Sequence, residues 1–132
     1  MLLIEESLQS LGRFKSQSLA DFESSRDNFR IASFDLHQFL EAVMDIGSHV
    51  LSRIPGVRPE RYKDIARLLG EHGIVPRECA DGPLLKMAGY RNRMVHFDDE
   101  ISIRELHGII QNDLSDLETF SRHAKLLLAQ TL

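Results

Sequence analysis

The residues most able to do chemistry in this sequence are Arg91 and His96, which stand five positions apart in the stretch KMAGYRNRMVHFDDEIS, residues 86–102. Histidine titrates near neutral pH, so its imidazole can serve as a general acid or base. Arginine offers planar, paired donors that bind phosphate oxygens as negative charge builds on them. With Asn92 to orient the histidine or bind phosphate, these groups are the ones that cleaving an RNA phosphodiester without a metal ion requires.

Two further cations flank this pair. Lys86 and Arg93 are suited to bind the RNA backbone on either side of the cleaved phosphate. Tyr90 has two interpretations, because its ring can stack on a base or pack in the core or a dimer contact, and we expect packing.

The Arg-x4-His spacing alone is a weak signal. On a continuous helix Arg91 and His96 would lie about 140° apart. Ser102 begins a capping box, so the preceding helix should end near His96 and leave the imidazole free to turn toward Arg91. The competing interpretation is a solvated helix end with Arg91 paired to Asp98 or Glu100, and spacing alone favours it.

Helical periodicity dominates the chain, and the alternation typical of strands is absent. Because apolar stripes on helices can be buried only against one another, the sequence predicts an all-α fold, an antiparallel bundle of four to five helices. Gly47 lies on one stripe and is expected to allow close approach of two helices. The expected helices cover about residues 4–14, 25–53, 60–72, 76–96 with an interruption at DGP and a restart at Pro83, and a last segment from the capping box Ser102–Glu105 to the C-terminus.

Length and composition limit the kinds of protein to which this chain can belong. The 132 residues fit one domain, 1–132, and 42% apolar with 27% charged residues is ordinary for a globular protein. No long uncharged apolar run is present, and Glu5 and Glu6 argue against a signal peptide, so we expect a cytoplasmic protein that does not enter the membrane. The net charge of −4 restricts any polyanion site to a local patch, and the single Cys79 supports neither a disulfide nor a thiolate metal site.

A ladder of potential metal ligands, His37, Glu41, Asp45 and His49, recurs every four residues. Each step drifts about 40° around a helix, and no second helix carries Glu-x-x-His. We therefore interpret the ladder as a polar flank. No metal site is expected, and without a glycine-rich phosphate loop no cofactor is expected either.

The stretch MAGYRNRMVHFDDEIS, preceded by GIVPREC and by LEAVMDIGSHVL, resembles the HepT-like toxins of the HEPN superfamily, over about residues 25–120. In that family a helical bundle carries an Arg-polar-x-x-x-His signature after a Met-Ala-Gly-aromatic lead. The resemblance implies a HEPN-type bundle that forms a homodimer, with both Arg91–His96 pairs in one cleft, and a metal-independent endoribonuclease used as a toxin. The usual partner is a minimal nucleotidyltransferase antitoxin of the MntA kind. Which RNA is cut, tRNA or another, stays open.

One position departs from the family pattern. The signature commonly continues His-x-Tyr, and the antitoxin attaches adenylate to that tyrosine, whereas this chain has Asp98 there. A carboxylate cannot be modified as a phenol is, so inhibition by this route is in doubt. Asp98 either imitates the charge of the modified state or marks a chain that has lost toxicity. The rival function is accordingly a catalytically impaired HEPN dimer that binds RNA or its antitoxin.

Overall fold

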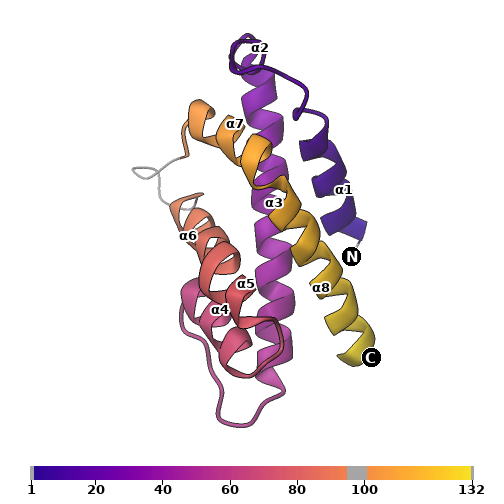
Figure 1. The fold of residues 1–132 in the computed structure, drawn as a ribbon, viewed down its shortest axis with the longest axis vertical. Helices are drawn as coiled ribbons and strands as arrows, with labels where there is room; N and C mark the ends of the chain where they lie inside the picture. The colour runs from indigo at the N-terminus through magenta and orange to yellow at the C-terminus, as the bar shows by residue number, and fades with distance from the viewer. Residues whose placement is uncertain (1, 95–100, 132) are drawn as a thin grey trace.

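The computed structural model describes residues 2–94 and 101–131, and within these ranges the secondary structure is helical, without strands (Figure 1). The all-α prediction is thereby confirmed. None of the helices in these ranges combines the length and hydrophobicity that crossing a lipid bilayer requires. In chain order the elements are α1 (Leu2–Gly12), α2 (Leu19–Glu23), α3 (Arg26–Ser52), α4 (Tyr62–Glu71), α5 (Arg77–Cys79), a π-helical turn η1 (Ala80–Leu84), α6 (Leu85–Met94), α7 (Ile103–Asn112) and α8 (Leu114–Thr131).

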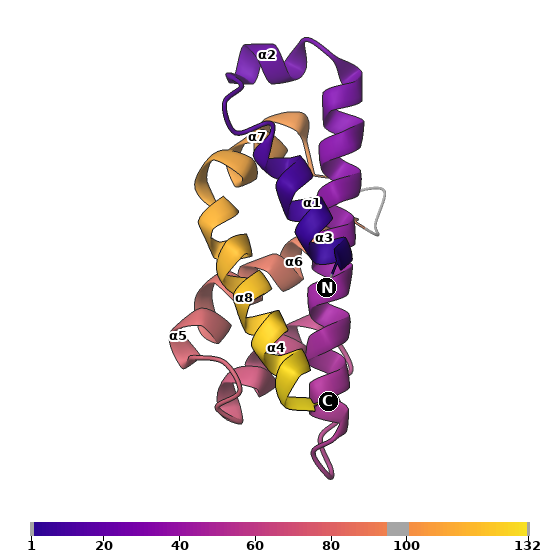
Figure 2. The same cartoon turned by 90° about the vertical axis from the view of Figure 1, so that its right-hand side faces the viewer.

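Helix α3 forms the axis of the bundle. It contributes a continuous buried stripe, because its apolar residues recur every three or four positions. Helices α1 and α8 pack on one side of it, α1 antiparallel, and α4 and α6 pack on the other (Figures 1 and 2). The fully buried residues of α3 are Ala32, Leu36, Phe39, Leu40, Met44 and Leu51.

Helix α2 was not expected from the sequence. It has only five residues and a single buried apolar side chain, Phe22, so it shows no periodicity. Ser18 caps it by accepting a hydrogen bond from the Asp21 N–H at 3.1 Å. Phe22 packs edge-on against Phe14, with ring centroids 5.5 Å apart, which fixes this corner to the core.

Two predicted boundaries were wrong. The expected last helix is divided into α7 and α8 at Asp113, whose backbone leaves the helical conformation and whose carboxylate pairs with Lys86 at 3.2 Å. The apolar stripe continues across this bend, so periodicity cannot show it. The expected interruption at DGP and restart at Pro83 do not occur. The wider π-helical turn η1 accommodates Pro83, and the chain stays helical from Arg77 to Met94.

Glycines permit two close approaches between helices. A Cβ atom added at Gly47 of α3 would lie 2.8 Å from Cγ2 of Ile65 in α4, which confirms the expected role of Gly47. A Cβ atom added at Gly70 of α4 would lie 2.6 Å from the Cβ atom of Ala80 in η1. These contacts bring α4 against both α3 and the start of the segment that carries Arg91.

Replacing Gly70 with alanine is expected to lower the free energy of unfolding by about 1–3 kcal/mol, because both Cβ atoms are fixed to their backbones and neither can rotate away. The gain in helix propensity, about 1 kcal/mol, offsets only part of this. Urea unfolding followed by circular dichroism measures the change. Gly108→Ala is the matched control, since no atom lies within 4 Å of a Cβ added there, and this variant should be slightly more stable. Equal stability of the two variants would show that α4 and η1 are not in close contact.

Candidate active site around helix α6

Helix α6 presents different side chains on its two sides. Met87, Ala88 and Tyr90 are buried in the bundle. Arg91 and Arg93 lie in the last turn, where the helix dipole favours positive charge. By helical periodicity Arg91 lies on the opposite side of α6 from Lys86 and Arg93. Its side chain faces α3 and α4. The residues expected to form one site are thus divided between two places.

Arg91 is largely buried and held by two neighbouring helices. Its side chain is 11% exposed and forms an ion pair with Glu41 of α3. Its Nη2 donates a hydrogen bond to the Tyr62 hydroxyl at 2.8 Å, and its guanidinium carbon lies 4.3 Å from the centroid of the Tyr62 ring. Arg91 is therefore not solvated, as the competing interpretation required, and its alternative partners Asp98 and Glu100 lie outside the described residues.

The same side of α3 places a second carboxylate, Asp45, in the electrostatic field of this pair. Partial displacement of water around Asp45 raises its pKa, the Glu41 carboxylate raises it further, and Arg91 lowers it. His37 lies on the other side of Glu41, with Nε2 3.8 Å from Oε1. The ladder is thus more than a polar flank, because Glu41 binds the guanidinium. Within residues 2–94 and 101–131 no group of three or more His, Cys, Asp or Glu comes together to hold a metal ion.

The other side of α6 carries a shallow pocket of about 320 Å³. It brings together the residues expected to contact the RNA backbone and adds Lys63 of α4, which lies across Gly89. Tyr90 is 9% exposed, as expected for packing, although it also lines the pocket. The lining residues are Lys63, Lys86, Gly89, Tyr90, Asn92 and Arg93.

Two cations of this pocket are paired with acids. Arg93 donates two hydrogen bonds to the Glu105 carboxylate, at 2.6 and 2.7 Å, and this interaction lowers the pKa of Glu105. Lys86 lies 3.2 Å from a carboxylate oxygen of Asp113, and the hydrogen bond between them raises the pKa of Lys86. No ion pair of Lys63 occurs within the described ranges. Lys63 is therefore the cation of this pocket most available to an incoming phosphate.

The capping box at α7 is half confirmed. The Ser102 hydroxyl accepts a hydrogen bond from the Glu105 N–H at 3.1 Å, as expected. The Glu105 carboxylate does not reach back to the Ser102 backbone but binds Arg93, because a guanidinium is a stronger donor than a neutral amide. The two helices on either side of the His96 segment are joined by this ion pair.

His96 and Asp98 lie in residues 95–100, outside the described residues, and so does Glu100. The proximity of His96 to Arg91 therefore stays a prediction. The acid that the structure places against Arg91 is Glu41.

Sequence reasoning missed Glu41, Asp45 and Tyr62 as neighbours of Arg91. The four-residue spacing placed Glu41 and Asp45 on one side of α3, but it carried no sign that α6 packs opposite them. Tyr62, the first residue of α4, gave no signal at all.

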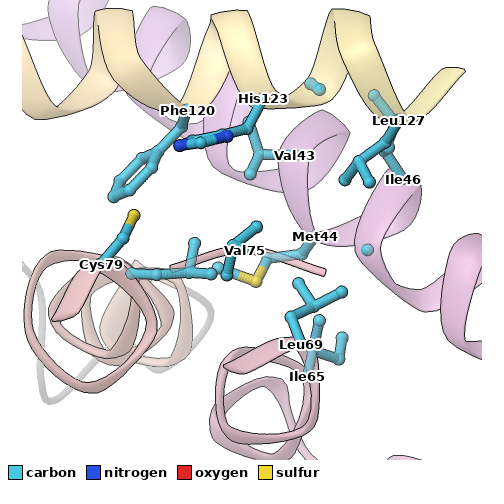
Figure 3. A pocket seen from close by; sticks show the side chains of 13 residues that line it. Val43, Met44, Ile46, Ile65, Leu69, Val75, Cys79, Phe120, His123 and Leu127 are labelled. Carbon is cyan, nitrogen blue, oxygen red and sulfur yellow. The ribbon is translucent and has the colours of Figure 1, made fainter. Parts of the chain in front are cut away.

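An apolar pocket of about 20 Å³ lies elsewhere, between α3, α4, α5 and α8 (Figure 3). Cys79 and His123 reach its edge beside Phe120. Burial raises the pKa of Cys79, which keeps the thiol protonated. None of its lining residues is an arginine or lysine that could bind a phosphate.

The family model described as Ribonuclease HepT-like matches residues 4–124. The chain belongs to this family. The resemblance to the HepT-like toxins of the HEPN superfamily is thereby confirmed. The chain is 28% identical over 120 residues to the "tRNA nuclease HepT" of Aphanizomenon flos-aquae, covering 91% of this chain and 81% of that protein. It is 29% identical over 86 residues to the "mRNA nuclease HepT" of Shewanella oneidensis, covering 65% of this chain and 64% of that protein.

Solved structures of toxin–antitoxin complexes contain chains with the same fold. A tri-AMPylated Shewanella oneidensis HEPN toxin in complex with its MNT antitoxin superimposes with a TM-score of 0.81, covering 95% of this chain and 92% of that one. A toxin–antitoxin complex with AMP-PNP gives a TM-score of 0.80, covering 95% and 93%. Both are 22% identical in sequence to this HepT-like chain, so they establish the HEPN bundle and nothing finer.

Proposed function

We propose that this HepT-like chain is a metal-independent endoribonuclease, the toxin of a toxin–antitoxin pair. The observation that carries the proposal is the fixed position of Arg91, a largely buried guanidinium at the end of α6, five residues before His96. Family membership and two relatives named as nucleases support it. The metal-free chemistry of an Arg–His pair suits this arrangement.

In this proposal each residue has a distinct role. His96 transfers a proton at the ribose 2′-hydroxyl or at the leaving oxygen, and Arg91 binds the scissile phosphate and stabilises its growing charge. Asn92 lines the basic pocket with Lys63 and Arg93, so we assign it to the flanking phosphates rather than to the histidine. Lys86 and Tyr90 complete that pocket.

We further propose that the chain works as a homodimer through the outer face of α3. Ile31 and Phe34 are large apolar residues exposed on this face, and Phe34 is 61% exposed. A hollow of about 280 Å³ beside Phe34 is also lined by Met94 and Ile101, the residues on either side of the His96 segment. A second copy docking here would cover the exposed apolar surface and bring two Arg91–His96 pairs together.

The proposed partner of the dimer is an antitoxin of the minimal nucleotidyltransferase type. Solved structures with the same fold include toxin–MNT antitoxin complexes, one of them with an AMPylated toxin. Because Asp98 replaces the expected tyrosine, we propose that the antitoxin inhibits this chain by binding rather than by modifying that position.

Incubating total cellular RNA with the purified protein in excess EDTA tests the function. Cleavage by the native protein, and none by a variant with both Arg91→Ala and His96→Ala, is the expected result. Cleavage that EDTA abolishes would contradict the metal-independent mechanism. Binding of RNA without cleavage would favour the rival function, a catalytically impaired binding module.

A further inference from the structure

We propose that Glu41 of α3, assisted by Tyr62 of α4, is a positioning residue for Arg91. It holds the guanidinium from behind so that the far edge faces the scissile phosphate. This inference rests on the proposed ribonuclease function and assigns a role to two residues outside the Arg-x4-His signature.

The N–H donors of Arg91 are divided between protein partners and an open terminal edge. A guanidinium has five N–H donors in one rigid plane. The Nε side of Arg91 faces the Glu41 carboxylate, and one N–H of Nη2 binds the Tyr62 hydroxyl. No partner for Nη1 or for the second N–H of Nη2 occurs within residues 2–94 and 101–131. The terminal edge, which is the edge that grips a phosphate with two parallel hydrogen bonds, is thus the part left open.

Glu41 and RNA do not compete for the same donor, the Nε–H of Arg91. The Nε atom of Arg91 has no exposed surface, and no acceptor in the described ranges lies along its N–H bond. The contact with Glu41 is therefore an ion pair rather than an aligned hydrogen bond. A phosphate arriving from solvent cannot replace the carboxylate at a buried atom. Glu41 consequently acts as an anchor and not as a latch that RNA must displace.

The positive charge of Arg91 also has to be neutralised. A guanidinium this deeply buried requires a counterion, because removing an unpaired charge from water is costly. Glu41 supplies this counterion, and the Tyr62 ring stacks on the guanidinium and limits its rotation. The same carboxylate weakens the ground-state attraction for phosphate. Glu41 therefore contributes to the orientation of Arg91 and not to the affinity for RNA.

The positioning role of Glu41 predicts a kinetic signature that a purely structural residue lacks. In Glu41→Gln the guanidinium loses its anchor while the site loses a negative charge. The kcat for cleavage of a short RNA is expected to fall about 10- to 100-fold, since small misplacements of a catalytic group have effects of this size. KM should stay unchanged or decrease. Glu41→Asp, which keeps the charge on a shorter side chain, should recover part of the kcat.

The control is Glu71→Gln, which breaks the exposed ion pair of Glu71 with Arg67 on α4, 3.0 Å long in the native protein. It should change neither constant by more than about twofold. Circular dichroism of each variant checks that the bundle is folded. Native-like kcat in Glu41→Gln, or an increased KM as its main effect, would overturn the positioning role.

A second measurement separates failure of this inference from failure of the proposed function. In ¹⁵N-labelled protein, the heteronuclear NOE of the Arg91 Nε–Hε group reports how firmly the guanidinium is held. It should be high in the native protein and in Glu71→Gln but low in Glu41→Gln. If the native protein cleaves no RNA, the ribonuclease proposal fails and this NOE alone decides. An equally rigid Nε–Hε group in Glu41→Gln would then overturn the proposal that Glu41 holds Arg91 in place.

Discussion

Arg91→Lys is expected to reduce the rate of RNA cleavage by about 100- to 1,000-fold, although the charge is conserved. A compact ammonium group lacks the planar fork of the guanidinium, which meets Glu41 and the Tyr62 hydroxyl and still offers two parallel donors at its terminal edge. Losing donors that stabilise charge in the transition state typically has effects of this size. Single-turnover cleavage of a fluorescent RNA, with the protein in excess, measures the loss.

Arg67→Lys is the matched control for this experiment. Arg67 also pairs with an acid, Glu71, but on the exposed surface of α4. Its replacement should leave cleavage within about twofold of the native rate. If Arg91→Lys retained more than a tenth of the native rate, the guanidinium geometry would have no special role, and a simple positive charge would suffice.

Phe34→Asp is expected to weaken dimerisation at least 100-fold, a change of about 3 kcal/mol. The side chain is 61% exposed in the single chain, so folding should tolerate the change, but a carboxylate in an apolar dimer contact would be desolvated without a partner. Because the single cleft of the dimer is proposed to need both copies, cleavage should fall in parallel at nanomolar protein. Sedimentation velocity across a range of concentrations measures the association.

Leu126→Asp provides the comparison, since Leu126 is 60% exposed but lies on α8. This variant should dimerise and cleave as the native protein does. A native chain that stays monomeric at every concentration, or a Phe34→Asp variant that associates normally, would refute the assignment of this face.

The extent of the helices could be predicted well from the sequence, because apolar stripes and caps are local signals. The long helix expected over 25–53 is α3, Arg26–Ser52. The failures were local structures without a periodic signal. The bend at Asp113 coincides with an ion pair to a cation 27 residues earlier in the chain, Lys86, and the π-helical turn at Pro83 continues a helix where proline usually ends one.

The candidate site could be predicted only in part. Arg91 was found from its place in a family signature, but its neighbours Glu41 and Tyr62 come from two other helices that no spacing rule connects to it. Lys86 and Arg93 were expected to be available to RNA, and both have acidic partners on the segment that follows α6, Asp113 and Glu105. Pairings of this kind follow from how helices are arranged in space, which a one-dimensional pattern does not contain.

The bond between Arg93 and Glu105 has a consequence for how this family can vary. It ties the end of α6 to the start of α7 through two side chains that flank residues 95–100. Because neither partner of the bond belongs to that segment, a substitution there, such as the aspartate at position 98, leaves both partners in the chain. New modes of control can therefore evolve at position 98 while this link between the two helices is kept.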